Sequence, residues 1–382
     1  MKKLMLTTAI ASVFATAAIA QTSITGEIRV SYKDVSMPKG STGVLTNKDR
    51  NYGFGAEQQV NFRNAGKLNV GGLDYVAGFS MENDGEQTGT LFNENMYIDL
   101  INASSGTTIS FSRDHIQRSD SDRSTANLVG YSPNELTQIN NATNGGTRFS
   151  AGIGAAPGQA FGAALLQKTP FGTFSGLFVP NNAAPAAGTV TNATAASQSA
   201  VVGTGVPVVN ANTVGLASSE AVNPNTTAAY ELGFVGDLTI KGLEVHYFKN
   251  ENNDLANTWG NGAVKAKGVN YGAKYNMGQF TIGANAKKFN PEQQLLNETK
   301  ETHYGVAMAV NKDLSVGLTY AKAEKSGAGA SNTGTDQKVK AVQIGYVLGP
   351  VDLAVAYAKG EDAEGNAGAD NDVFMARLIG RF

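Results

Sequence analysis

The stretch VQIGYVLGPVDLAVAY, residues 342–357, carries the pattern on which the fold assignment depends. Two runs of alternating side chains, 342–348 and 351–357, flank the dipeptide Gly349-Pro350, and such a pair predicts an antiparallel β-hairpin. Three similar pairs precede it in the C-terminal half: 229–235 with 238–248, 269–277 with 280–289, and 304–310 with 314–320. This half of the chain therefore predicts a meander of hairpins.

The connections between these runs alternate in length. Turns within a hairpin are short, whereas longer polar stretches separate one hairpin from the next: 250–266, 290–299, 324–337 and 360–371. Tight turns at one end and long loops at the other are typical of transmembrane β-barrels, whose periplasmic ends are short. A soluble β-sandwich has no reason to segregate its connections in this way.

Side chains within the runs alternate between apolar and polar, and successive strand residues face opposite sides of a sheet. The first run sets one group against another: Ile24, Ile28, Val30 and Tyr32 against Ser23, Thr25, Glu27, Arg29 and Ser31. Runs 73–82, 269–277 and 374–382 repeat the pattern. A barrel with apolar residues outside and polar residues inside requires lipid around it and water within it.

An antiparallel sandwich with one wet face has the same period and is the alternative. Two features favour the barrel. The inward sets carry charged residues, namely Glu27, Arg29, Glu57, Asp74, Asp99, Lys274 and Arg377. Aromatic residues recur near the strand ends, as in the girdles of membrane barrels: Tyr32, Tyr52, Phe62, Tyr247, Tyr271, Tyr304, Tyr320, Tyr346 and Tyr357.

The composition agrees with many strands and tight turns. The chain of 382 residues has 45 Gly but only 10 Pro and 1 Trp, and it has no Cys for a disulfide framework.

Residues 1–20 are expected to be a cleaved secretory signal, because Lys2 and Lys3 precede an apolar run that ends in Ala18-Ile19-Ala20. The net charge of −2, or −4 without those two lysines, argues against a nucleic-acid partner.

Residues 21–382 are expected to form one all-β domain, a transmembrane antiparallel barrel of sixteen strands, with eighteen strands as the alternative. The sixteen runs are 22–33, 51–62, 73–82, 94–102, 107–114, 146–154, part of 161–179, 228–236, 239–249, 267–277, 279–289, 300–311, 313–323, 338–348, 351–360 and 372–382. Counting 126–133, 147–154, 161–168 and 173–179 as separate strands raises the number to eighteen. Residues 180–227, rich in Ala, Asn, Thr and Val, predict a long surface loop.

From residue 22 to its end, the chain resembles the Gram-negative general porins. The resemblance lies in TSITGEIRV at 22–30, in Arg123 followed by NLVGYSP at 127–133, and in a final strand that ends at Phe382. It implies a sixteen-stranded homotrimer in the outer membrane, surrounded by lipid and lipopolysaccharide. It also implies that the third outer loop, here about 115–145, folds into each barrel and narrows it. By the same resemblance, Phe382 is the signal that the outer-membrane assembly machinery recognises.

A porin needs a constriction in which acids on the loop face bases on the wall, because a field across the pore aligns dipolar solutes. Arg29 and Arg377 have inward parity on strands that barrel closure would put side by side, and Lys274 and Lys287 share this parity on distant strands. Each of the four is either a constriction residue or an ordinary lumen residue. Loop 3 carries both signs, unlike the acidic loops usual in the family: Asp114, Asp120, Asp122 and Glu135 with Arg113, Arg118 and Arg123. The ion preference therefore stays open.

Enzymatic and metal sites find little support in the sequence, and no cofactor is expected. The three histidines, His115, His246 and His303, lie far apart and match no metal-ligand spacing. Asp99 and Asp114 are the acids that could hold Ca²⁺ with loop oxygens, but no EF-hand loop accompanies them. The sequence thus favours a passive porin for small hydrophilic solutes and ions over a substrate-specific channel, and both over a barrel hydrolase built on His246.

Overall fold

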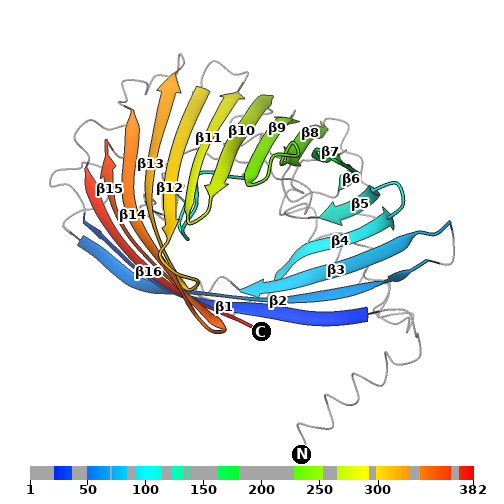
Figure 1. Ribbon diagram of the computed structural model, residues 1–382, viewed down its shortest axis with the longest axis horizontal. Helices are drawn as coiled ribbons and strands as arrows, with labels where there is room; N and C mark the ends of the chain where they lie inside the picture. The colour runs from blue at the N-terminus through cyan, green and yellow to red at the C-terminus, as the bar shows by residue number, and fades with distance from the viewer. Residues whose placement is uncertain are drawn as a thin grey trace, which may run out of the picture.

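The computed structural model describes residues 21–36, 50–68, 71–83, 92–113, 123–132, 136, 162–179, 228–252, 265–291, 298–326, 336–362 and 370–382. These residues form a closed barrel of sixteen antiparallel strands (Figure 1). The strands are β1 (Gln21–Ser36), β2 (Arg50–Lys67), β3 (Asp74–Asn83), β4 (Phe92–Asn102), β5 (Thr107–Arg113), β6 (Gly162–Thr169), β7 (Gly172–Val179), β8 (Ala229–Gly236), β9 (Leu243–Asn252), β10 (Ala266–Met277), β11 (Phe280–Pro291), β12 (Glu298–Ala309), β13 (Leu314–Ser326), β14 (Gln337–Leu348), β15 (Val351–Glu361) and β16 (Asn371–Arg381). Each strand pairs with its neighbours in the chain, and β1 pairs with β16.

The predicted number of sixteen strands is confirmed, and the alternative of eighteen is wrong. Residues 126–132 form no strand, and the ring reaches sixteen because 162–179 supplies two strands, β6 and β7. β5 pairs directly with β6. The ring closes without 146–154, so the prediction that this run is one of the sixteen strands is wrong. Its residues lie outside the described ones, as do the expected signal at 1–20 and the expected surface loop at 180–227. Across the described ranges, no helix is long and apolar enough to cross a membrane.

The four hairpins predicted in the C-terminal half are confirmed, because β8–β9, β10–β11, β12–β13 and β14–β15 are all antiparallel pairs. Gly349 turns the last of them with φ of 71°, a conformation that costs glycine little. The β8–β9 turn is longer than predicted, since 238–242 precede β9. Leu238 and Thr239 take φ of 51° and 63° there, and the Asp237 carboxylate accepts a hydrogen bond from the Thr239 amide at 2.9 Å.

The barrel closes where the first and last strands meet. β1 and β16 are in register from Glu27 to Ser36 of β1. Beyond this ladder, the Gly26 amide donates to the Phe382 carbonyl at 2.9 Å and the Phe382 amide donates to the Gly26 carbonyl at 3.0 Å. A Cβ built on Gly26 would lie 2.4 Å from the Phe382 ring, so the ring covers a position that a larger residue could not share.

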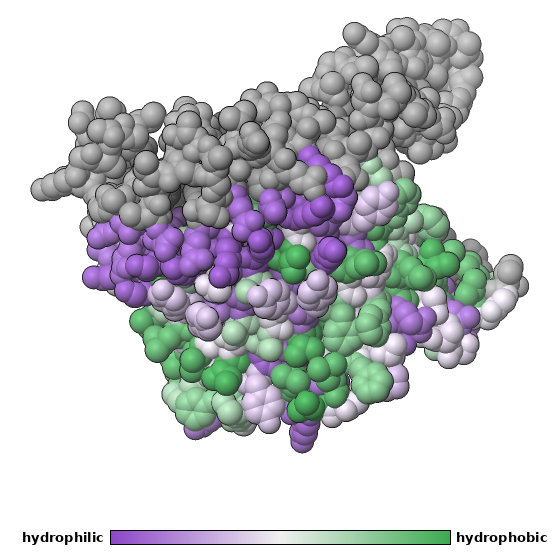
Figure 2. Space-filling view, turned by 90° about the horizontal axis from the view of Figure 1, so that it is seen from above, coloured by the Kyte–Doolittle hydropathy of each residue, from purple (hydrophilic) through white to green (hydrophobic). Residues whose placement is uncertain are grey.

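The outward faces of the strands carry an apolar band, as predicted. Exposed hydrophobic side chains of outward parity include Ile28, Val30, Tyr271, Val306 and Leu378. Figure 2 shows hydrophobic residues gathered in the lower part of the view, with hydrophilic residues above them on one side. Aromatic pairs recur on the same face, among them Tyr32–Phe54, Phe62–Phe79 and Tyr304–Tyr320. The outside therefore has the surface that a bilayer requires.

The predicted polar interior holds only in part. Toward the loop ends of β13 to β16 the inward positions are apolar and the outward positions are charged. The inward set is Ala321, Ala323, Val339, Ala341, Ala356, Ala358 and Val373, and the outward set is Lys322, Glu324, Lys338, Lys340, Lys359 and Glu361. β13 has 13 residues, which span ~43 Å, or ~33 Å along the barrel axis at a tilt of ~40°, against an apolar band of ~25 Å. The loop ends thus stand above the hydrocarbon, where the inward face can form a core.

Candidate functional site

Arg29 lies in an ion-pair network on the inner faces of β1 and β2. Its guanidinium contacts Glu27 and is 2.8 Å from the carboxylate of Glu57. Glu27 is also 3.6 Å from Arg381 of β16, which in turn contacts Asp352 of β15. Basic and acidic groups therefore alternate across four adjacent strands. The predicted wall base Arg29 faces inward, and its charge is balanced by its neighbours.

A second network lies on the other side of the ring, on β9 and β10. Arg123 Nε and Nη2 donate to Glu244 Oε1 at 3.1 and 2.8 Å, and Lys274 Nζ is 2.8 Å from Glu244 Oε2. Glu244 and Lys274 are register partners. The structure thus brings together the predicted bases Arg123 and Lys274 through Glu244, which the sequence analysis missed although its inward parity on β9 could have marked it.

Residues 123–132, here called the inner segment, lie against inward-facing positions of β10 to β16 (Figure 1). At the start of the segment, Asn270 Nδ2 donates to the Arg123 carbonyl at 2.8 Å, and the buried Thr125 hydroxyl donates to the Ala284 carbonyl at 2.6 Å. A buried hydroxyl left without a partner costs ~1–3 kcal/mol. These contacts therefore hold the first residues of the segment on the barrel wall.

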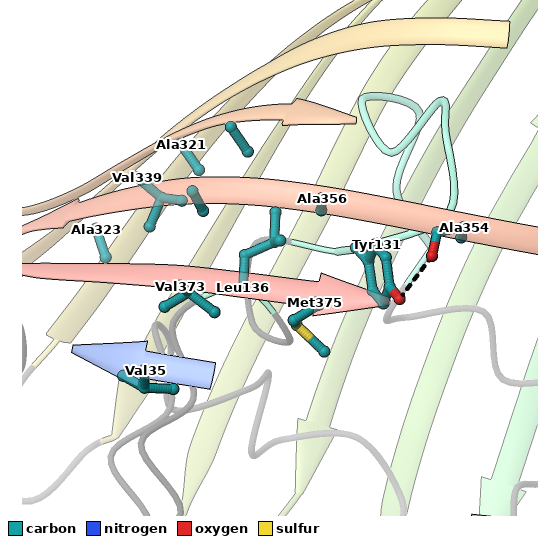
Figure 3. Packing of buried hydrophobic residues seen from close by; sticks show 12 residues of the cluster. Val35, Tyr131, Leu136, Ala321, Ala323, Val339, Ala354, Ala356, Val373 and Met375 are labelled. Atoms are coloured by element: carbon teal, nitrogen blue, oxygen red, sulfur yellow. Dashed lines mark hydrogen bonds between the residues drawn. The ribbon is translucent and has the colours of Figure 1, made fainter. Parts of the chain in front are cut away.

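Tyr131 fixes the far end of the inner segment. Gln343 of β14 accepts a hydrogen bond from the Tyr131 amide at 2.8 Å and donates to the Tyr131 carbonyl at 3.0 Å. The same Gln343 amide nitrogen is 3.0 Å from Thr319 Oγ1, and the Tyr131 hydroxyl donates to the Ala354 carbonyl at 3.2 Å (Figure 3). Tyr131 is fully buried. One wall glutamine thus satisfies both backbone groups of a residue that has no strand partner.

An apolar cluster surrounds Tyr131 and Leu136 (Figure 3). It comprises Val35, Tyr131, Leu136, Ala321, Ala323, Val339, Ala341, Ala354, Ala356, Ala358, Val373 and Met375. Small side chains on the strands leave room for the two large ones, as close packing requires. The inward faces of β13 to β16 are therefore apolar for a local reason, because they pack against Tyr131 of the inner segment and against Leu136.

Arg377 binds the inner segment. Its Nη2 donates to the Gly130 carbonyl at 2.6 Å, and its guanidinium carbon lies 4.6 Å from the centroid of the Tyr131 ring, a cation–π distance. Its inward parity and its closeness to Arg29 agree with the sequence, since Ser31 is the register partner of Arg377. No pattern in the sequence predicted that Arg377 contacts Gly130 and Tyr131.

Lys287 and two histidines are buried on the inner faces of β9, β11 and β12. Lys287 is the register partner of Glu301, and His303 Nε2 lies 3.2 Å from the Glu301 carboxylate. His246 Nε2 is 3.2 Å from Asn270 Oδ1. Lys287, predicted as a wall base, has 7 % of its surface exposed, so it contributes little to the surface of the lumen.

The remaining predicted site residues lie outside the described residues: Asp114, His115, Arg118, Asp120, Asp122, Glu135 and the side chain of Arg113. Asp99, a candidate calcium ligand, is buried on the inner face of β4. Among the residues with a described position, no group of three His, Cys, Asp or Glu could hold a metal ion. Asp114, the other acid considered for Ca²⁺, is not among the described residues, so Ca²⁺ binding by this pair stays untested.

Comparisons with known proteins agree with the barrel. Residues 242–377 match the family model described as Gram-negative porin. The anion-selective porin from Comamonas acidovorans is 13 % identical, with a TM-score of 0.62 over 95 % of this chain and 100 % of that one. Salmonella typhi OmpF, in complex with daunomycin, is 13 % identical, with a TM-score of 0.60 over 94 % and 97 %. OmpT of Vibrio cholerae is 12 % identical, with a TM-score of 0.58 over 96 % and 100 %. No curated protein sequence is similar enough to match.

Replacement of Gln343 by Ala should release the backbone of Tyr131. The buried amide and carbonyl would lose their partners, at a cost of ~1–3 kcal/mol, so amide exchange at Tyr131 should accelerate ~10- to 100-fold. Hydrogen exchange of the purified barrel in detergent measures this rate. Gln337→Ala is the matched control, because Gln337 is buried on the same face of β14 and its Oε1 accepts no bond from the described residues. Equal protection of Tyr131 in wild type and Gln343→Ala would contradict the role of Gln343.

Proposed function

We propose that this chain belongs to the Gram-negative porins, whose family model matches residues 242–377, and that it is an outer-membrane channel through which small hydrophilic solutes and ions diffuse passively. The observation that carries the proposal is the closed barrel with an apolar outward band and charged networks on its inner face. Charges in a dry interior would cost several kcal/mol each. Water beside Arg29 and Lys274 removes that cost, and a barrel that admits water also admits small polar solutes.

Passive diffusion is tested by adding the purified protein to a planar lipid bilayer. Conductance should rise in discrete steps whose size grows in proportion to salt concentration, and the flux of small uncharged solutes into proteoliposomes should rise linearly with their concentration. Flux that saturates at low solute concentration would favour a substrate-specific channel. A bilayer that stays silent while the protein is folded would contradict a channel altogether.

We also propose that the inner segment narrows the barrel in the way implied for loop 3 of general porins. The contacts of the segment with β10 to β16 support this proposal. Arg123 supports it too, because this residue of the segment forms an ion pair with Glu244, which also pairs with Lys274. The Arg29 network lies on strands about half the ring away. The two networks would then form opposite sides of one constriction, to which the loop acids Asp120, Asp122 and Glu135 would add.

Removal of Arg29 tests this constriction. Arg29→Ala leaves Glu27 and Glu57 without their shared base, so the reversal potential under a salt gradient should shift toward cations. The shift should shrink at high salt, because the Debye length falls from ~10 Å at 0.1 M to ~3 Å at 1 M. Arg377 is left unchanged in this experiment, since its removal would also free Gly130.

Lys300→Ala is the matched control for Arg29→Ala. It removes one positive charge from an outward-facing side chain that is 56 % exposed and lies 3.7 Å from Glu324. Its reversal potential should stay at the wild-type value. If both variants behave like wild type at low salt, Arg29 is an ordinary lumen residue.

The proposed membrane partners are the lipid and lipopolysaccharide implied by the family. Lysines on the outward faces of β11 and β13 to β15 support lipopolysaccharide as a partner, because they lie toward the loop ends of these strands. They form cross-strand pairs with acids: Lys288–Glu298, Lys322–Asp336, Lys338–Glu361 and Lys359–Asp372. A belt of this kind suits phosphate groups at the level of the outer headgroups.

Phe382 is proposed as the signal for barrel assembly into a homotrimer. Phe382→Asp keeps the two backbone bonds to Gly26 but removes the exposed ring, so less trimer should reach the outer membrane while synthesis is unchanged. Quantitative gels of unheated outer membranes measure this. Phe171→Asp is the control, because Phe171 is an exposed aromatic residue of the β6–β7 turn. Trimer levels equal to wild type in Phe382→Asp would refute the signal.

A further inference from the structure

Five consecutive strands each present a glycine to the inner segment. These residues, here called the glycine track, are Gly272 of β10, Gly283 of β11, Gly305 of β12, Gly317 of β13 and Gly345 of β14. All five have inward parity, and Gly283 and Gly305 are direct register partners. None has the positive φ that favours glycine. Since glycine weakens a strand interior, its recurrence here needs another cause.

The cause is the close approach of the inner segment. A Cβ built on Gly283 would lie 1.9 Å from the Thr125 carbonyl oxygen, and one built on Gly305 would lie 2.1 Å from the Ala126 carbonyl oxygen. Both obstacles are backbone atoms, so no side-chain rotation can relieve them. At Gly317 the obstacle is the side chain of Val129, whose Cγ2 would be 2.7 Å away.

From this geometry we infer that the glycine track sets the width of the pore, because it lets the inner segment lie directly on the wall. The inference rests on the proposed function and adds positioning residues to it. A methyl group at Gly305 would need the Ala126 carbonyl to move by roughly 1.3 Å to reach ordinary contact. The wall is hydrogen-bonded on both sides, whereas residues 126–129 of the segment lie between its anchors at Arg123 and Thr125 and those at Gly130 and Tyr131. In a variant with this methyl group, the inner segment rather than the wall should therefore move, and it should move toward the barrel axis.

Single-channel conductance tests the inference. Gly305→Ala and Gly317→Ala should each lower conductance by roughly 20–50 %, as expected when one side of a narrow pore moves inward by about 1 Å. Gly53→Ala is the matched control, because Gly53 is an inward-facing strand glycine with no described atom within 4 Å of its Cβ position. Its conductance should equal that of wild type. Unchanged or increased conductance in Gly305→Ala and Gly317→Ala would overturn the inference.

A rescue variant separates steric displacement from misfolding. Val129→Ala removes the Cγ atoms that meet the new methyl group, so Gly317→Ala combined with Val129→Ala should return conductance toward the value of Val129→Ala alone. The same change should not rescue Gly305→Ala, where the obstacle is a carbonyl. Failure of the rescue at Gly317 would overturn the inference, whereas a wild-type protein that conducts no ions would instead refute the proposed function.

Discussion

Hydrogen bonding of the backbone is the constraint on which the rest of this structure depends. A strand that faces hydrocarbon has no water to satisfy its amide and carbonyl groups, and each unsatisfied group costs several kcal/mol. The barrel meets this demand by pairing β1 with β16 and extending the ladder through Gly26 and Phe382. Once the ring is closed, the direction of each side chain decides the rest: outward positions carry the apolar residues that contact with lipid requires, and inward positions hold charges such as Arg29 and Lys274.

The inner segment departs from this rule and meets it in another way. Residues 123–132 have no strand partners, so wall side chains satisfy their backbone groups, with Gln343 at Tyr131, Asn270 at Arg123 and Arg377 at Gly130. The wall beneath is accordingly modified, with glycines where the backbone approaches and alanines around Tyr131 and Leu136. In this part of the barrel, inward side chains are apolar because they contact the segment and Leu136 rather than water.

The sequence predicted features that depend on short-range pattern. Alternation and turn residues gave the four C-terminal hairpins, the parity of Arg29 and Arg377, and a ring of sixteen. It misassigned residues 126–132 as a possible strand, because Val129 and Tyr131 alternate like strand residues although their apolar groups pack on the wall. Glu244 and Gln343 were missed because their partners, Arg123 and Tyr131, are more than a hundred residues away, a distance over which periodicity carries no information.

A water-filled barrel in a membrane has lipid on one side of β1 and water on the other. The chain contains no cysteine, so single cysteines can report this without background. Val30 faces outward and Ser31 inward at adjacent positions. A small charged thiol reagent that cannot enter hydrocarbon, applied to the protein in lipid bilayers, should modify Ser31→Cys rapidly and Val30→Cys slowly. Equal rates at the two positions, or faster modification at position 30, would contradict a water-filled barrel.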